Sequence, residues 1–233
     1  MHDNPTGEPE PAPATKGAQT RRAVLDAAIT RFGREGYRAT SVADIARDAG
    51  VGGTVAYAYF PNKEALFIAA ADEDAAAIIT EGLAAAVSEP DVSAWGKSLF
   101  TALIAALDSH PLARRLLGGL EPEVTGRVLG IPALNEIRKA FAERLGSGQL
   151  QGEVRPEIDP VTIANGVVAI VLSLLMSVVQ LGEPAAELVR GDIDAVFDAA
   201  IAVRPPSPRR RADAPARPAP GPGSVPGQGP TRR

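Results

Sequence analysis

Hydroxyl-bearing and small apolar side chains in the first quarter of the chain are suited to contacts with nucleic acid. Thr40 and Ser41 stand where a helix would begin, so that backbone N–H groups and a hydroxyl could face a phosphate. Thr54 can hydrogen-bond a base edge or a phosphate, and Val55 and Ala58 can contact thymine methyl groups. This chemistry belongs to binding rather than to catalysis.

Three short helices are predicted to position these side chains. The first shows apolar residues at helical spacing, with Thr20 as its expected cap and Gly36 at its expected end; its apolar positions are Leu25, Ala28, Ile29 and Phe32. The second repeats the pattern at Val42, Ile45, Ala46 and Ala49. Ser41, followed three residues later by Asp44, resembles a capping box, and Gly50 is the natural end of this helix.

A short turn separates the second helix from a third over residues 53–60. Two helices joined so closely must cross steeply, which is the helix-turn-helix arrangement. Phe60 precedes Pro61 and therefore closes the third helix, and Asn62 is expected to cap a long fourth helix.

The segments GYRATSVADIARDAG and AYFPNKEALF resemble the N-terminal domain of the TetR family of bacterial transcriptional regulators. The resemblance covers about 50 residues, and its most specific stretch runs from Tyr57 to Leu66. It implies a homodimer whose third helices enter successive major grooves of a palindromic operator. It also implies that a small molecule bound in the C-terminal domain releases the DNA, most often in a repressor.

The resemblance also assigns roles to individual residues. It implies that Tyr57 and Tyr59 contact phosphates and base edges and that Lys63 contacts a phosphate. The positions that read bases in the family are here Gly53, Thr54, Val55 and Ala58. The family's usual serine and basic residue at the start of this helix are replaced by Gly52 and Gly53, so we expect few direct base contacts and more weight on phosphate positioning and DNA shape.

The charge distribution agrees with a basic head on an acidic body. Residues 16–63 carry eight basic and four acidic side chains, a net charge of +4. Residues 64–203 carry nine basic and twenty acidic side chains, a net charge of −11, although the whole chain has only −4. Such a separation orients a protein on a polyanion.

Residues 64–203 are predicted to form five or six helices of a ligand-binding and dimerisation domain, which makes the fold all-α. Candidate walls of a ligand pocket are Phe67, Trp95, Phe100, Leu103 and Phe141, with Asn135 and Arg138 as polar contacts; each of these could equally be plain core or surface.

The helix expected over residues 160–181 is apolar nearly all round, so it must be covered on two sides. One side can pack on its own domain, and the other, together with the helix expected over 183–203, is predicted to meet a second copy of the chain. The expected interface residues are Ile163, Val167, Ile170, Leu174, Val178, Ile193, Val196 and Phe197. A transmembrane span is disfavoured because the uninterrupted apolar run is too short, and a monomer with a fully buried hairpin is the other alternative.

The sequence offers little for catalysis, metals or cofactors. It has no cysteine and two histidines, and no complete phosphate-binding loop or nucleophile elbow, so we expect no enzyme activity, no metal and no cofactor. Residues 1–15 read as a disordered arm without a signal peptide, and 204–233 as a disordered Pro/Arg-rich tail, either solubilising or adding DNA affinity. A cytoplasmic, nucleoid-associated protein is expected. The alternative function is a helical small-molecule-binding protein with a vestigial DNA-binding head.

Overall fold

The computed structural model describes residues 15–182, 191 and 195–203. The regular structure of these residues is helical, and one isolated antiparallel bridge pairs Val154 with Ala202. The all-α prediction is therefore confirmed. The predicted arm, the Pro/Arg-rich tail, the start of the last helix and Ile193 lie outside the described residues.

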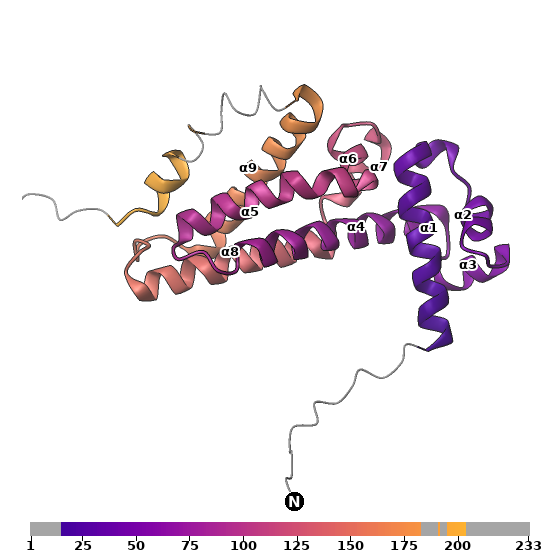
Figure 1. The fold of residues 1–233 in the computed structure, drawn as a ribbon, viewed down its shortest axis with the longest axis horizontal. Helices are drawn as coiled ribbons and strands as arrows, with labels where there is room; N and C mark the ends of the chain where they lie inside the picture. Colours follow the sequence, from indigo (N-terminus) through magenta and orange to yellow (C-terminus); the bar gives the residue numbers. More distant parts are fainter. Residues whose placement is uncertain (1–14, 183–190, 192–194, 204–233) are drawn as a thin grey trace, which may run out of the picture. The chain divides into compact units, whose positions relative to one another are not determined.

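The first three helices form a head around their own apolar core (Figure 1). They are α1 (Lys16–Ala39), α2 (Val42–Asp48) and α3 (Gly53–Tyr59). The fully buried Phe32 of α1 packs edge-on against Phe67, with ring centroids 5.0 Å apart, and Ile45 and Ala56 close the core from α2 and α3. The spacing of apolar residues in the sequence therefore identified the buried faces of α1 and α2.

The start of α1 differs from the prediction. Thr15, not Thr20, caps the helix by accepting a hydrogen bond from the backbone N–H of Ala18. Thr20 lies one turn inside, where its hydroxyl donates to the carbonyl of Lys16. The cap prediction at Thr20 was wrong because apolar spacing locates the buried face and not the first polar turn. The helical rotation stops at Gly36, whose φ of 85° suits glycine.

The predicted ends of α2 and α3 are confirmed. Ser41 caps α2 by accepting from the N–H of Asp44, and Gly50 turns the chain away with φ of 67°. Gly52 precedes α3 without any side-chain cap, and Phe60 ends the helix in an extended conformation. The side-chain amide oxygen of Asn62 accepts from Ala65, 2.7 Å away, and so starts α4 (Lys63–Ala86) as expected.

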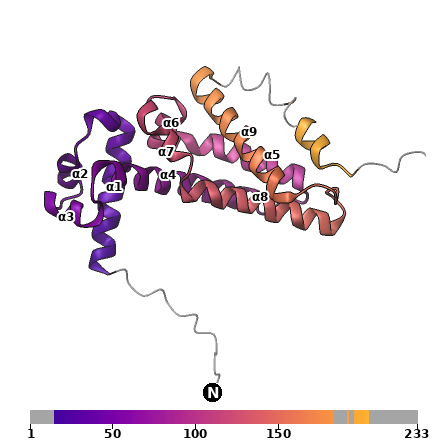
Figure 2. The ribbon, with the colours of Figure 1, turned by 180° about the vertical axis from the view of Figure 1, so that it is seen from behind.

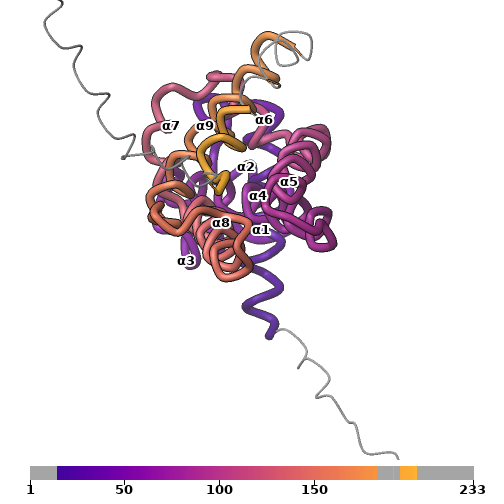
Figure 3. The backbone as a smooth tube through the Cα atoms, turned by 90° about the vertical axis from the view of Figure 1, so that its left-hand side faces the viewer, coloured from indigo at the N-terminus to yellow at the C-terminus, as the bar shows by residue number. Residues whose placement is uncertain are grey.

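The remaining helices form a body with a second apolar core. They are α5 (Val92–Ala106) with a 3-10 turn at Leu107–Ser109, α6 (Pro111–Leu117), α7 (Pro122–Val128), α8 (Pro132–Gln151) and α9 (Pro160–Leu181). Residues 195–201 are also helical. The view turned by 90° shows α4 between α5 and α8, and it packs against both (Figure 3).

The short helix α6 belongs to both parts of the molecule. It packs against α1 of the head and against α9 of the body, and the view from behind shows it with α7 beside α1 (Figure 2). Leu112 and Leu116 are buried in the head core. A Cβ added at Gly33 of α1 would come within 2.9 Å of Pro111, so the two helices touch where α1 carries no side chain. The head is thus held by α6 as well as by α4.

The helix α9 is long and apolar enough to cross a membrane by length and composition, with a mean hydropathy of 2.3. Within the chain it contributes Val168, Val171 and Leu175 to the core of the body. Only 22% of its most apolar 18 residues are buried in a single copy. Its outer face therefore leaves apolar side chains exposed, among them Ile170 at 42%.

Candidate nucleic-acid interface

The outward face of α3 carries the side chains that the sequence proposed as base-reading. Gly53, Thr54, Val55 and Ala58 are all exposed, whereas Ala56 is fully buried. None of the exposed four has a side-chain hydrogen bond or ion pair in the described chain. The inward face of α3 holds the helix in place, and its outward face forms no side-chain hydrogen bond or ion pair with the described residues.

The two tyrosines of this helix differ in exposure. Tyr57 is 53% exposed, and Tyr59 is half-buried against the head core. The Tyr59 hydroxyl lies near the backbone of Gly17 at the start of α1. Tyr57 is therefore placed for outside contacts along most of its ring, whereas Tyr59 divides its surface between the head and its outer edge.

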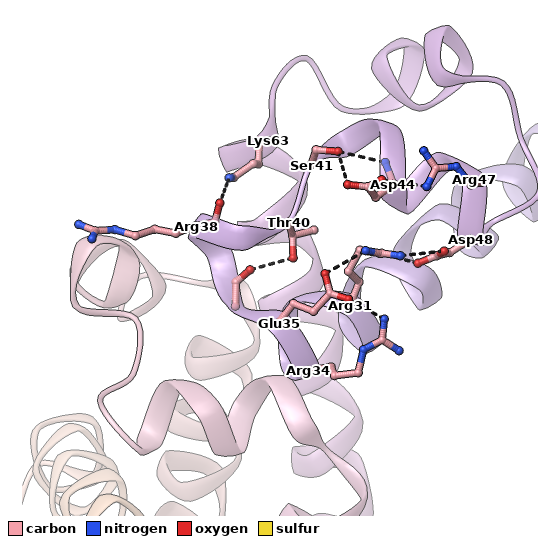
Figure 4. Close-up of polar contacts among 11 residues, drawn as sticks. Arg31, Arg34, Glu35, Arg38, Thr40, Ser41, Asp44, Arg47, Asp48 and Lys63 are labelled. Atoms are coloured by element: carbon pink, nitrogen blue, oxygen red, sulfur yellow. Dashed lines mark hydrogen bonds and ion pairs between the residues drawn. The ribbon is translucent and has the colours of Figure 1, made fainter.

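The hydroxyl groups proposed to face a phosphate are engaged within the protein. Thr40 is 2% exposed, and its hydroxyl donates to the carbonyl of Gly36 over 2.8 Å. Ser41 accepts from the N–H of Asp44 and donates to its carboxylate over 2.6 Å, which lowers the pKa of Asp44 below its ordinary value (Figure 4). The start of α2 therefore offers its backbone N–H groups to an anion. The carboxylate of Asp44 beside them would repel that anion.

Lys63 lies at the start of α4, beside the loop that follows α1. Its Nζ is 3.4 Å from the carbonyl oxygen of Arg38 and 4.4 Å from the centroid of the Tyr37 ring (Figure 4). A carbonyl and a ring face orient the ammonium without neutralising it. The side chain predicted to contact a phosphate thus has no carboxylate partner among the described residues.

An ion-pair network holds α2 against α1. The half-buried Arg31 donates to Asp48, at 3.0 Å from one carboxylate oxygen, and to Glu35 over 2.9 Å (Figure 4). Its hydrogen bonds keep the pKa of Asp48 below the ordinary value and raise the pKa of Arg31. Sequence reasoning counted Arg31 as a free charge, and nothing local in the sequence links it to a partner seventeen residues away.

Ion pairing divides the basic side chains of the head into two groups. Five are paired with carboxylates: Arg22, Arg31, Arg34, Arg38 and Arg47. Lys16, Arg21 and Lys63 have no ion pair among the described residues, although the guanidinium of Arg21 lies over the ring of Phe60. The net charge of +4 is therefore carried mainly by these three side chains.

A buried carboxylate joins the head to the body. Glu121, 6% exposed, precedes α7 and accepts from the backbone N–H of Tyr37 over 3.2 Å and from Nε of Arg115. A Cβ at Gly36 would collide with both of these side chains, so the glycine is needed for its positive φ and for this close approach. No local pattern indicates this contact, because Glu121 stands 84 residues from Tyr37 in the sequence.

Two apolar cavities lie in the body. The first, here called the α9 cavity, measures about 200 Å³ and is lined by α5, α8, α9 and the helix at 195–201. The second, called the head-proximal cavity, measures about 130 Å³ and is lined by residues of α4 to α9. Of the proposed ligand contacts, Phe100 and Phe141 line the α9 cavity and Leu103 lines the head-proximal cavity.

The other proposed ligand contacts lie elsewhere. Phe67 is fully buried in the head core, and Trp95 packs edge-on against Phe141 with ring centroids 4.8 Å apart. Asn135 and Arg138 bond to each other over 2.9 Å in a shallow surface depression. The structure thus separates these residues into four places. Large aromatic residues were chosen from the sequence by size, and size does not distinguish a cavity wall from a filled core.

The proposed interface residues line the α9 cavity. Those that do so are Ile163, Val167, Ile170, Leu174, Val196 and Phe197, whereas Val178 is half-buried further along α9. Val196 is 63% exposed, but Leu174 is only 6% exposed and is already covered by its own chain. The exposed members, not Leu174, are the ones available to a second copy.

This geometry defines a helix-turn-helix domain with a helical body, and comparisons with known proteins identify the family. Residues 24–70 match the model of bacterial regulatory proteins of the TetR family. The A-factor receptor protein of Streptomyces griseus is 31% identical over 159 residues, which cover 68% of this chain. The chain spans about half the length of this curated relative, 54%. The head of the chain, over residues 24–70, therefore matches the TetR family.

Solved structures show the same fold. A protein from Shewanella sp. PV-4 assigned to the TetR family is 26% identical, with a TM-score of 0.59 over 79% of this chain and 99% of that one. FadR from Bacillus subtilis, solved in complex with stearoyl-CoA, is 16% identical, with a TM-score of 0.61 over 77% of this chain and 98% of that one. The fold of the body, beyond the matched segment, is therefore also that of TetR-family structures.

Proposed function

We propose that this protein is a ligand-responsive transcriptional regulator that binds a palindromic DNA operator as a homodimer, acting as a repressor. The observation that carries the proposal is the outward face of α3. Its side chains from Thr54 to Ala58, apart from the buried Ala56, are exposed and form no hydrogen bond or ion pair with any described residue. Lys63 and Arg21, which have no ion pair in the described part of the chain, supply cations on the same head. A positively charged surface around an exposed helix fits the major groove and its flanking phosphates.

The proposed dimer follows from the surface of α9. Ile170 and Leu181 are 42% and 70% exposed on the same side of α9, which is costly in water. A second copy that covers this face would fix the distance between the two heads. For both to bind successive major grooves, the two α3 helices must lie about 34 Å apart. We therefore expect dimerisation and DNA binding to be lost together.

Ligand response is proposed from the way the head is held. Both α4 and α6 leave the body to pack against the head, so a ligand between them would change the spacing of the heads. It would release DNA only if it favoured the conformer that cannot bind. The A-factor receptor and the stearoyl-CoA complex of FadR show that relatives carry ligands, and we infer the same property for this chain.

The proposal is tested with DNA that flanks the protein's own gene. The full chain should bind a palindromic segment of this DNA in a gel shift, with an affinity that falls as salt rises. Thr54→Ala should reduce the free-energy difference between the preferred base and the others at one operator position by about 1–3 kcal/mol, because the residue is proposed to contact a base edge. Binding that is indifferent to sequence in both proteins would contradict the assignment of α3.

The alternative is a helical small-molecule-binding protein with a vestigial DNA-binding head. The observation in its favour is the start of α3, where Gly52 and Gly53 offer no side-chain donor and α3 has no side-chain cap. Ligand binding without any salt-sensitive, palindrome-dependent DNA binding would favour this alternative. We further expect a cytoplasmic protein without enzyme activity.

A further inference from the structure

The head-proximal cavity shares its wall with the core of the head. Ala71 of α4 and Leu116 of α6 are buried in the head core and also line this cavity. Val128, at the end of α7, packs against both cores and lines it too. The described lining of the α9 cavity includes no residue of the head core. A change in the head-proximal cavity therefore moves atoms on which the head rests.

We infer that the head-proximal cavity binds a compact, uncharged, hydrocarbon-like effector, an inference that rests on the proposed ligand response. Its described lining consists of apolar side chains and one threonine. The hydroxyl of that residue, Thr125, already donates to the carbonyl of Glu121 over 2.7 Å. A charged or strongly hydrogen-bonding ligand would lose its hydration here and find no new partner.

The volume of the cavity limits the size of the effector. An apolar cavity of about 150 Å³ in a protein core stays dry and takes up benzene. The head-proximal cavity, at about 130 Å³, is of the same scale. One aromatic ring or a short branched alkyl group fills this space, whereas a long acyl chain would extend beyond it, past the exposed side chains of Leu129 and Met176.

The α9 cavity is a poorer candidate for the effector. Its wall includes Lys97, whose Nζ lies 3.3 Å from the carboxylate of Asp198 on the helix at 195–201. Six of its other lining residues, on α9 and on the helix at 195–201, are among those proposed to meet the second copy. We expect this cavity to be covered by dimer formation rather than by a ligand.

The lining of the head-proximal cavity also explains how a bound effector would change the position of the head. Ala75 and Ile78 line it from α4, and Leu116 and Leu117 line it from α6. Next to Leu116, Arg115 bonds to Glu121, which in turn holds the N–H of Tyr37 in the head. An occupant that separates α4 from α6 would therefore shift both attachments of the head together.

Toluene and benzoate, used with the full chain, test the chemical class of the effector. They present the same ring, without a charge and with one. Toluene should raise the Tm in calorimetry, give saturation-transfer NMR signals and weaken operator binding about tenfold, whereas benzoate should do none of these. Equal binding of benzoate, or no binding of toluene, would overturn the inference on the unaltered protein, so this test does not depend on a variant that folds.

A matched pair of cavity-filling variants tests the location. Ala75→Leu adds the same side-chain volume to the head-proximal cavity that Ala200→Leu adds to the α9 cavity. Toluene affinity should fall at least tenfold in Ala75→Leu and stay unchanged in Ala200→Leu. The opposite result would move the site to the α9 cavity and overturn the inference.

The same experiments separate this inference from the proposed function. A chain that binds its operator but not toluene overturns the inference and leaves the regulator proposal intact. A chain that binds toluene at Ala75 but binds no DNA overturns the regulator proposal and leaves the ligand class of the cavity standing.

Discussion

The head and the body are built from the same kind of helix but leave different surfaces without partners. In the head, charged side chains such as Arg31 and Asp48 pair with one another, and the exposed residues of α3, apart from Tyr57, are small and form no ion pair among the described residues. In the body, α9 leaves large apolar side chains in the open, among them Ile170 and Leu181. The first surface suits a hydrated polyanion and the second an apolar partner. The proposed role of each region therefore follows from the kind of side chain that it leaves exposed.

The largest effect is expected where the apolar surface of the body is broken. Ile170→Glu places a charge on the exposed face of α9 and should convert the proposed dimer into monomers in sedimentation velocity. Operator affinity should fall about 100-fold or more, because a single head binds only one half-site. Leu174 is unsuitable for this test, because its own chain buries it and a glutamate there would unfold the body.

The control for this variant is Leu150→Glu, which makes the same change at a side chain that is 91% exposed on α8. It should leave both the sedimentation coefficient and the operator affinity unchanged. A dimer that survives Ile170→Glu would place the interface on another surface.

The second prediction concerns the contact between head and body. Glu121→Gln removes the charge from a buried carboxylate that bonds to Arg115 and Tyr37. The free energy of unfolding in urea should fall by about 1–3 kcal/mol, because hydrogen bonds between charged, buried groups contribute on that scale. Glu123→Gln is the matched control, since its pair with Arg38 is 47% and 82% exposed. It should cost less than about 1 kcal/mol, and equal losses would refute a special role for Glu121.

The third prediction returns to the surface of the head. Lys63→Ala should weaken binding to all DNA sequences by roughly tenfold and reduce the salt dependence by about one counterion. Lys139→Ala removes an equivalent charge from α8 of the body and should change neither quantity. A change of base preference in Lys63→Ala would mean that this lysine reads bases and that its assignment to a phosphate is incorrect.

The comparison between head and body also describes how far sequence reasoning reached. The helices of the head were predicted because their caps and ends are local signals, such as Ser41 with Asp44 or Gly50. The buried faces were predicted because apolar spacing depends on one helix at a time. These signals sufficed for the fold of the head and for the exposed face of α3.

Contacts between segments that are distant in the sequence were not predicted. In the body, such contacts determine which residues line the two cavities. Nothing local links Arg31 to Asp48 or Glu121 to Tyr37, so neither contact was expected. Phe67 was proposed as a pocket wall because it is large, but neighbours from α1 enclose it completely. Whether an apolar residue faces a cavity or a filled core depends on side chains from several helices, and sequence periodicity does not carry that information.

The fourth prediction concerns the response of the two regions to acid. Hydrogen bonds from arginine or serine lower the pKa values of Glu35, Asp44, Asp48 and Glu123, all on the head or in contact with it. A carboxylate whose pKa is lowered on folding stabilises the fold above its ordinary pKa of about 4 and loses this effect as the pH falls through its folded value. The head should therefore lose structure before the body below about pH 4. The shift should be modest because exposed ion pairs contribute little.

The resonances of head and body amides in NMR spectra recorded from pH 6 to pH 3 would follow this order. The body serves as the internal control, because among its described residues the pKa is clearly lowered at Asp159 and at Glu123, and Glu123 owes this to Arg38 of the head. Simultaneous loss of both regions would mean that head and body unfold as one cooperative unit, so that the head's own ion pairs do not set a separate acid stability.

The smallest effect is expected at two glycines beside α3 that both have room for a side chain. Gly53 is at the start of the helix, and Gly50 is in the turn before it. A Cβ added at Gly53 or at Gly50 would meet nothing within 4 Å. Gly53 opens a helix, so Gly53→Ala should raise the free energy of unfolding by about 0.5 kcal/mol. Gly50 has φ of 67°, so Gly50→Ala should lower it by about 1 kcal/mol.

Because packing is the same at both positions, the difference in sign between these variants in urea denaturation isolates the backbone conformation. If Gly53→Ala is also destabilising, then α3 needs a flexible start rather than tolerating one. A flexible start would favour a helix that adjusts to the groove and would weaken the alternative of a vestigial head, since a surface that has lost its function has no reason to retain that freedom.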